Sequence, residues 1–106
     1  MIKELNLNDS VIVCDGLIDP DDNETHIGGW CGRVIEFIDD DLIKIVWDSI
    51  TLKSMSFEKI LKYEDEGIDW SAMYLEHGDV KKCLCRDTLK DVEIEIDRIE
   101  RKLRNY

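Results

Sequence analysis

The sequence predicts a small, mainly β fold: an open barrel of short strands with a short internal helix and a C-terminal amphipathic helix. Two observations support this prediction. Short apolar, β-branched runs alternate with polar turns up to about residue 85, and a longer segment with helical spacing follows. A chain of 106 residues also suits one hydrophobic core rather than two. We therefore expect a barrel domain over residues 1–85 and an appended helix over residues 86–106.

The first half of the chain contains three predicted strands. Residues 11–14 form a short β-branched run, which favours a strand. A polar loop follows over residues 15–29, where the sole proline and a Gly-Gly pair exclude regular structure. Residues 30–38 and 42–47 are two further apolar runs, separated by three aspartates. This arrangement predicts a β-hairpin with a tight polar turn.

The remaining barrel elements are shorter. Residues 50–52 predict a brief fourth strand, and residues 73–75 predict a closing strand. Between them Ser56 suits the N-cap of a helix that ends at Gly67. A strand, a long polar loop, a hairpin and a short last strand follow one another in the order of an SH3-like barrel.

The C-terminal segment has the clearest helical pattern. Thr88 and Asp91 match a capping box, which predicts the start of a helix. Apolar residues then recur at spacings of three and four, at Leu89, Val92, Ile96, Ile99 and Leu103. The pattern predicts an amphipathic helix of about four turns. Its apolar stripe has two alternative partners, which are the barrel of the same chain or the same stripe of a second chain in a homodimer.

A glycine-rich motif precedes the second predicted strand. The motif and the segments that accompany it are Asp19-Pro20, Ile27-Gly28-Gly29-Trp30 with Gly32, Trp47-Asp48, Thr51-Leu52, Gly67-Ile68-Asp69-Trp70 and Met73-Tyr74-Leu75. Together they resemble a group of small bacterial proteins of SH3-like character, over about residues 8–87. The resemblance implies the barrel fold, and it implies no catalytic residue.

The net charge of −11 at pH 7 restricts the partners of the protein. Nucleic acids and anionic membrane surfaces would be repelled, so we expect neither as a partner. A protein or a basic peptide suits an acidic surface better. The sequence shows no signal peptide and no apolar run long enough to span a membrane. We therefore expect a cytoplasmic protein whose four cysteines are reduced thiols.

The sequence lacks the motifs of most enzymes. Its two histidines, His26 and His77, lie in predicted loops without a nucleophile motif around them. There is no phosphate-binding loop, dinucleotide fingerprint or nucleophile elbow. We expect no catalytic residue and no enzyme activity.

Aromatic residues supply the first candidate site. In a small barrel a groove between loops is often lined by aromatic rings that hold a peptide. We expect such a groove to use Trp30, Trp70 and Tyr74, and we expect Trp70, between two polar residues, to be partly exposed. The alternative is that Trp30 and Trp47 fill the core. The leading functional prediction is a non-catalytic protein- or peptide-binding module.

Two acidic loops supply the alternative function, calcium binding. Oxygen ligands in the first loop alternate as they do at the start of an EF-hand, but the glycine and the final glutamate of that motif are missing. A calcium site of another type would use both loops on one barrel rim. Its predicted ligands are Asp19, Asp21, Asn23, Asp39, Asp40 and Asp41. No other cofactor is expected, and a solvated acidic rim or a docking site for a basic peptide remain alternatives.

Overall fold

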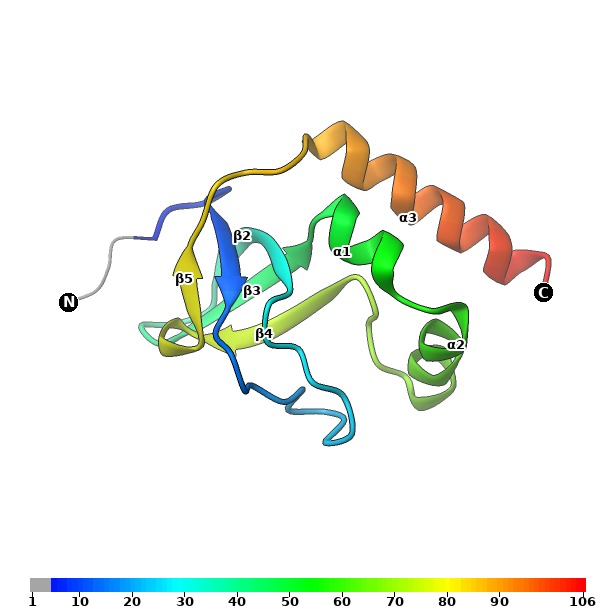
Figure 1. Cartoon of the computed structure of the whole chain (residues 1–106), viewed down its shortest axis with the longest axis horizontal. Coiled ribbons are helices and arrows are strands. Elements are labelled where there is room, and N and C mark those ends of the chain that lie inside the picture. The colour runs from blue at the N-terminus through cyan, green and yellow to red at the C-terminus, as the bar shows by residue number, and fades with distance from the viewer. Residues whose placement is uncertain (1–4) are drawn as a thin grey trace.

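The computed structural model describes residues 5–106, which form one five-stranded antiparallel sheet and three α-helices (Figure 1). In chain order the elements are β1 (Ser10–Val13), β2 (Cys31–Phe37), β3 (Leu42–Trp47), α1 (Ser49–Ser54), α2 (Phe57–Glu66), β4 (Ala72–Glu76), the 3₁₀ turn η1 (His77–Asp79), β5 (Val80–Lys82) and α3 (Leu89–Arg104). The strand order across the sheet is β4-β3-β2-β1-β5.

The sheet is built from one meander and one closing pair. Strands β2 and β3 pair as the predicted hairpin. Strand β4 follows after helices α1 and α2 and pairs with the other edge of β3. Strand β1 pairs with β2 on one side and with β5 on the other, so the first and the last strand of the sheet lie side by side. Strand β5 was not predicted, because three residues that include two exposed lysines carry no recognisable pattern.

The core lies on one face of the sheet. Burial alternates along β3, where Ile43, Ile45 and Trp47 are fully buried, so this strand has the predicted bounds and the predicted period of two. Gly32 in β2 explains part of the glycine-rich motif. A Cβ atom at this position would lie 2.4 Å from the carbonyl oxygen of Val46 in β3. Only glycine allows the two strands to approach this closely.

Residues 50–52 form helix α1 instead of the predicted fourth strand. The side chain of Asp48 accepts a hydrogen bond from the Thr51 backbone N–H at 2.8 Å and so caps the first turn of the helix. Thr51 and Leu52 are buried, and this burial explains the short apolar run that suggested a strand. With three helices, one of them 16 residues long, the fold is mixed α and β, which corrects the predicted mainly β class.

The other two helices begin where the sequence predicts. Ser56 caps α2, and Gly67 ends it with a φ of 71°, a left-handed conformation that favours glycine. Thr88 and Asp91 form the predicted capping box of α3. Helix α3 lies along α1 with Val92 and Ile99 buried, so most of its apolar stripe packs within the chain, while Leu89 at its start is exposed (Figure 1). No helix within residues 5–106 combines the length and apolar character needed to cross a membrane.

Candidate peptide-binding groove

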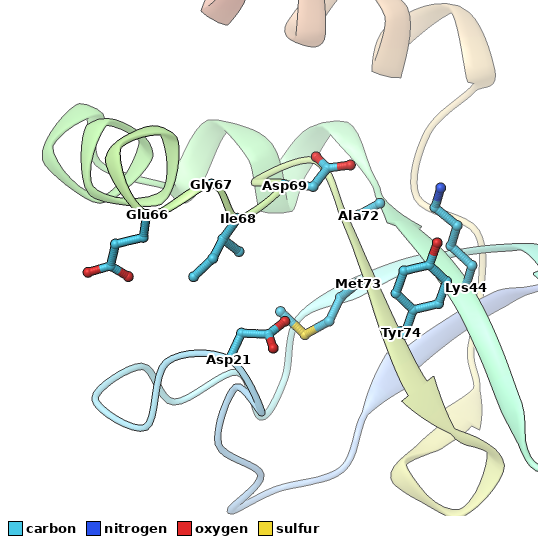
Figure 2. Close-up of a pocket in the computed structure, with 9 residues that line it drawn as sticks. All are labelled: Asp21, Lys44, Glu66, Gly67, Ile68, Asp69, Ala72, Met73 and Tyr74. Atoms are coloured by element: carbon cyan, nitrogen blue, oxygen red, sulfur yellow. The ribbon is translucent and has the colours of Figure 1, made fainter.

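A pocket of about 580 Å³ lies between the loop of residues 15–29, the C-terminal end of α2 and strand β4 (Figure 2). The residues that line it are Asp21, Lys44, Glu66, Gly67, Ile68, Asp69, Ala72, Met73 and Tyr74. We call it the β4 groove. Its volume is in the range of pockets that bind ligands.

Tyr74 supplies the aromatic surface of the β4 groove. It lies in β4 opposite Lys44 of β3, and its side chain is half exposed. The Lys44 ammonium group lies 5.5 Å from the centre of the Tyr74 ring, in the geometry of a cation–π contact. This contact orients the ring, whose remaining surface is open to a ligand.

The groove also has an apolar surface, on the opposite face of β4 from the Tyr74 ring. Met73 and Ala72 of β4 are buried. Gly67 turns the chain out of α2, and the Ile68 N–H donates to the Tyr63 carbonyl at 2.8 Å, which holds Ile68 at the end of the helix. Figure 2 shows Ile68, at the end of α2, and Met73, in β4, pointing toward the same hollow.

Carboxylates form the rim of the groove. Asp21, Glu66 and Asp69 line it, against the single cation of Lys44. Asp69 is oriented by the N–H and hydroxyl of Ser71, which donate to one carboxylate oxygen at 2.8 and 2.7 Å. Asp21 and Glu66 have no side-chain hydrogen bond or ion pair to another residue within residues 5–106. The rim therefore has a negative charge that the described part of the chain leaves uncompensated.

The end of α2 adds to this negative charge. Its last three residues are Glu64, Asp65 and Glu66, and its last turn contains no basic residue. A helix C-terminus carries the negative end of the helix dipole and favours cations. Three consecutive carboxylates at this end lower the stability of the helix, and a cationic ligand would relieve the repulsion.

The loop of residues 15–29 is anchored, which gives the groove a fixed wall. The buried Asp19 carboxylate accepts hydrogen bonds from the Tyr63 hydroxyl of α2 and from the Asp21 N–H. Burial, together with the bond to Asp19, raises the pKa of Tyr63 well above its usual value, so the phenol remains a donor. Asp22 accepts from the Thr25 hydroxyl at 2.7 Å, and this bond lowers the pKa of Asp22.

Of the three predicted peptide-binding aromatics, only Tyr74 lines the groove. Trp70 is 5% exposed rather than partly exposed, because its indole N–H donates to Glu64 at 2.8 Å and its ring packs in the core. Trp30 is half buried and meets the buried Trp47 edge to face, with 5.0 Å between the ring centres. Trp47 therefore lies in the core, as the alternative prediction has it, whereas Trp30 packs against the core and is only partly buried.

The structure does not bring the predicted calcium ligands together. The loop of Asp19, Asp21 and Asn23 packs on α2, whereas the turn of Asp39, Asp40 and Asp41 packs on η1, where the His77 N–H donates to the Asp41 carbonyl. Asp39 uses its carboxylate to accept from two N–H groups of its own turn. Residues 5–106 contain no group of three or more metal-ligating side chains placed to hold an ion.

Sequence reasoning missed Glu66, Ile68 and Asp69 as groove residues. A usable signal was present, because an apolar residue directly after a helix-ending glycine often packs back on the last turn. The turn after Gly67 lies only a few residues before the predicted strand of residues 73–75, so the residues of this turn could have been expected close to Tyr74. Asp21 was predicted as a metal ligand, and it lies on the groove rim instead.

A second charged cluster lies where the segment between β5 and α3 crosses the sheet. It comprises Arg33, Asp48, Cys85, Arg86 and Asp87, and we call it the strap cluster. The Arg33 guanidinium donates to the Asp87 carboxylate at 2.7 Å and contacts the Cys85 sulfur at 3.1 Å. Arg86 donates to Asp48 at 2.8 Å. The cluster thus forms its ion pairs internally.

Asp87 joins three elements within the strap cluster. Its second carboxylate oxygen accepts from the Ser49 N–H at the start of α1, at 2.6 Å, while the first contacts Arg33 of β2. Desolvation opposes ionisation, but the hydrogen bonds from Ser49 and Arg33 outweigh it and hold the pKa of Asp87 below its usual value. The ionised carboxylate therefore ties the approach to α3 to the sheet and to α1.

Comparison with protein-family models, with curated proteins and with solved structures gives no match for this chain. The resemblance to small bacterial SH3-like proteins therefore stays a prediction.

Proposed function

We propose that the protein is a non-catalytic protein- or peptide-binding module and that the β4 groove is its binding site. One observation carries the proposal. A half-exposed aromatic ring, Tyr74, lies on one face of β4, an apolar surface of Ile68 and Met73 with acidic neighbours lies on the other face, and all of them line a single pocket. Apolar surface supplies affinity and a few polar groups supply orientation in sites of this kind.

The proposal includes the finer fold class, an SH3-like barrel over residues 1–85 with an appended helix over residues 86–106. The order of the strands supports it, because a three-stranded meander is closed by the pairing of β1 with the last strand, β5. The single 3₁₀ turn that joins β4 to β5 also supports it. In the cytoplasm, where we place this function, the four free cysteines would remain reduced.

The first test is selection of ligands from a random peptide library displayed on phage, with the immobilised full chain as bait. Selected sequences are then synthesised, and their affinities are measured by fluorescence anisotropy. We expect saturable binding in the micromolar range, with NMR amide shifts concentrated at Ile68, Met73 and Tyr74.

Tyr74→Ala is the diagnostic variant for the groove. Removal of a central aromatic contact should lower affinity about tenfold. Tyr106→Ala is the matched control, because Tyr106 is also exposed but contacts Phe57 at the start of α2. Failure of every selected peptide to bind, or equal effects of the two substitutions, would contradict the proposed site.

A further inference from the structure

Strand β4 has one unpaired edge, and this edge faces the groove. It is the terminal strand of the sheet and pairs only with β3 among residues 5–106. The Trp47 N–H donates to the Ser71 carbonyl at 3.0 Å, which sets the alternation of the backbone along β4. Met73 and Leu75 therefore direct their N–H and C=O groups to β3. Ala72, Tyr74 and Glu76 direct theirs outward, and the Glu76 N–H accordingly donates to Asp79 at 3.0 Å.

Within residues 5–106 the outward backbone groups of Ala72 and Tyr74 make no hydrogen bond, and Tyr74 is half exposed whereas Ala72 is 7% exposed, so a further strand would begin pairing at Tyr74. Proteins usually protect such edges with proline, lysine or a bulge. Strand β4 pairs with β3 in continuous register and contains neither proline nor lysine. At the opposite edge of the sheet, β5 is three residues long and carries Lys81 and Lys82. The β4 edge thus combines regular geometry with an adjacent pocket.

We propose that the β4 groove takes an extended basic peptide segment, which adds to the free edge of β4 as a sixth strand. The inference rests on the proposed function and specifies its partner. Main-chain hydrogen bonds to Ala72 and Tyr74 supply affinity, and alternate side chains of the added strand supply specificity. One set of side chains packs against Ile68 and Met73 below the carboxylates, and the other set lies beside the Tyr74 ring.

The charge of the groove selects the occupant. A lysine or arginine can lay its aliphatic stem on Ile68 and Met73 while its charged head reaches Asp21 or Glu66. An acidic segment would be repelled by the rim and by the net charge of −11. An uncharged segment would desolvate the rim carboxylates without pairing them. A segment in which basic and apolar residues alternate can pair with the rim carboxylates and also pack on Ile68 and Met73.

Strand addition is tested with amide hydrogen exchange measured by NMR, on the full chain with and without a selected peptide. The Ala72 and Tyr74 amides should exchange at least about tenfold more slowly in the complex, because each gains an acceptor. The Met73 amide already donates to β3, so its exchange should change far less. This alternation with a period of two distinguishes strand addition from a side chain that merely covers the pocket.

The basic character is tested with the double variant Asp21→Asn/Glu66→Gln. We expect at least a tenfold loss of affinity and a weaker dependence of affinity on salt, because both effects depend on the lost carboxylates. The matched control is Asp40→Asn/Glu93→Gln, which removes the same charge from exposed positions outside the groove. Thermal unfolding of both variants checks that each is folded.

The two proposals fail in different ways. If no selected peptide binds, the proposed function fails, and the inference fails with it. If peptides bind with shifts in the groove but the Ala72 and Tyr74 amides gain no protection, strand addition is wrong while the binding function stands. If binding is equal in the two double variants, the basic partner is wrong. An enrichment of acidic peptides in the selection would overturn it in the same way.

Discussion

The strap cluster and the β4 groove use the same types of charged side chain in opposite ways. In the strap cluster the side chains of Arg33 and Asp87 are only 8% and 4% exposed, and they pair with each other. In the groove Asp21 and Glu66 are exposed, and the described part of the chain offers them no partner. A buried ion must be paired because its desolvation costs several kcal/mol, whereas an exposed carboxylate stays hydrated. The difference separates charges that hold the fold from charges that remain available to a ligand.

The largest expected effect is on the strap cluster. Asp87→Ala leaves the buried Arg33 guanidinium without its carboxylate and the Ser49 N–H without its acceptor. We expect a loss of about 3–5 kcal/mol in the free energy of unfolding, measured by chemical denaturation. Asp40→Ala, in an exposed turn, should change the free energy of unfolding by less than about 0.5 kcal/mol. Similar effects at the two positions would show that the contacts of Asp87 stabilise the fold no more than an exposed turn carboxylate does.

Acid should weaken the same contact. Because the pKa of Asp87 is lower in the folded protein than in the unfolded chain, its contribution to stability is present above the unfolded pKa. That contribution is lost as the pH falls through the folded pKa. The stability difference between the wild type and Asp87→Asn should therefore be constant near neutral pH and shrink below about pH 4. Denaturation curves at a series of pH values measure this stability difference. A constant difference down to pH 2 would show that the pKa of Asp87 is not lowered by folding.

The thiols of the strap should differ in reactivity. Cys85 is exposed, and its hydrogen bonds with Ser10, Asp87 and Arg33 lower its pKa. Burial raises the pKa of Cys83 to about 11. Since the thiolate is the reactive form, iodoacetamide should modify Cys85 several times faster than Cys83 at pH 7.5. Peptide mass spectrometry over time measures the two rates, and equal rates would show that the contacts of Cys85 with Ser10, Asp87 and Arg33 do not persist in solution.

The smallest expected effect is on the groove. Glu66→Gln removes one carboxylate from the negative end of the α2 dipole. We expect the free energy of unfolding to stay unchanged or to rise by about 0.3–0.5 kcal/mol, measured by thermal or chemical denaturation. A clear loss of stability would mean that Glu66 holds the fold, and the groove would then resemble the strap cluster.

Local sequence signals predicted the elements that local interactions stabilise. Strand β3 follows from its alternating apolar residues. Helices α2 and α3 follow from their capping residues, which bond to backbone groups only three residues away. Residues 50–52 were wrongly predicted as a strand because their apolar run suits both structures, and the Asp48 cap decides for a helix. Strand β5 is too short to show an alternating sequence pattern, and it is a strand because it pairs with β1.

The candidate site shows the same limit. Tyr74 was predicted as a groove residue and lines the groove, whereas the prediction that Trp70 is partly exposed considered only its polar neighbours in sequence. Its actual partner is Glu64, six residues earlier on α2, and the turn at Gly67 brings the two side chains together. The groove likewise joins Asp21, Ile68 and Tyr74 from three separate segments.

The sequence by itself determined the periodic elements, the helix ends and the acidic character of this protein, because these depend on neighbouring residues and on composition. Only the tertiary structure decided which carboxylates are paired and buried and which strand edge stays open. Pairing and burial depend on contacts between residues tens of positions apart, such as Arg33 with Asp87, and no local pattern encodes these contacts.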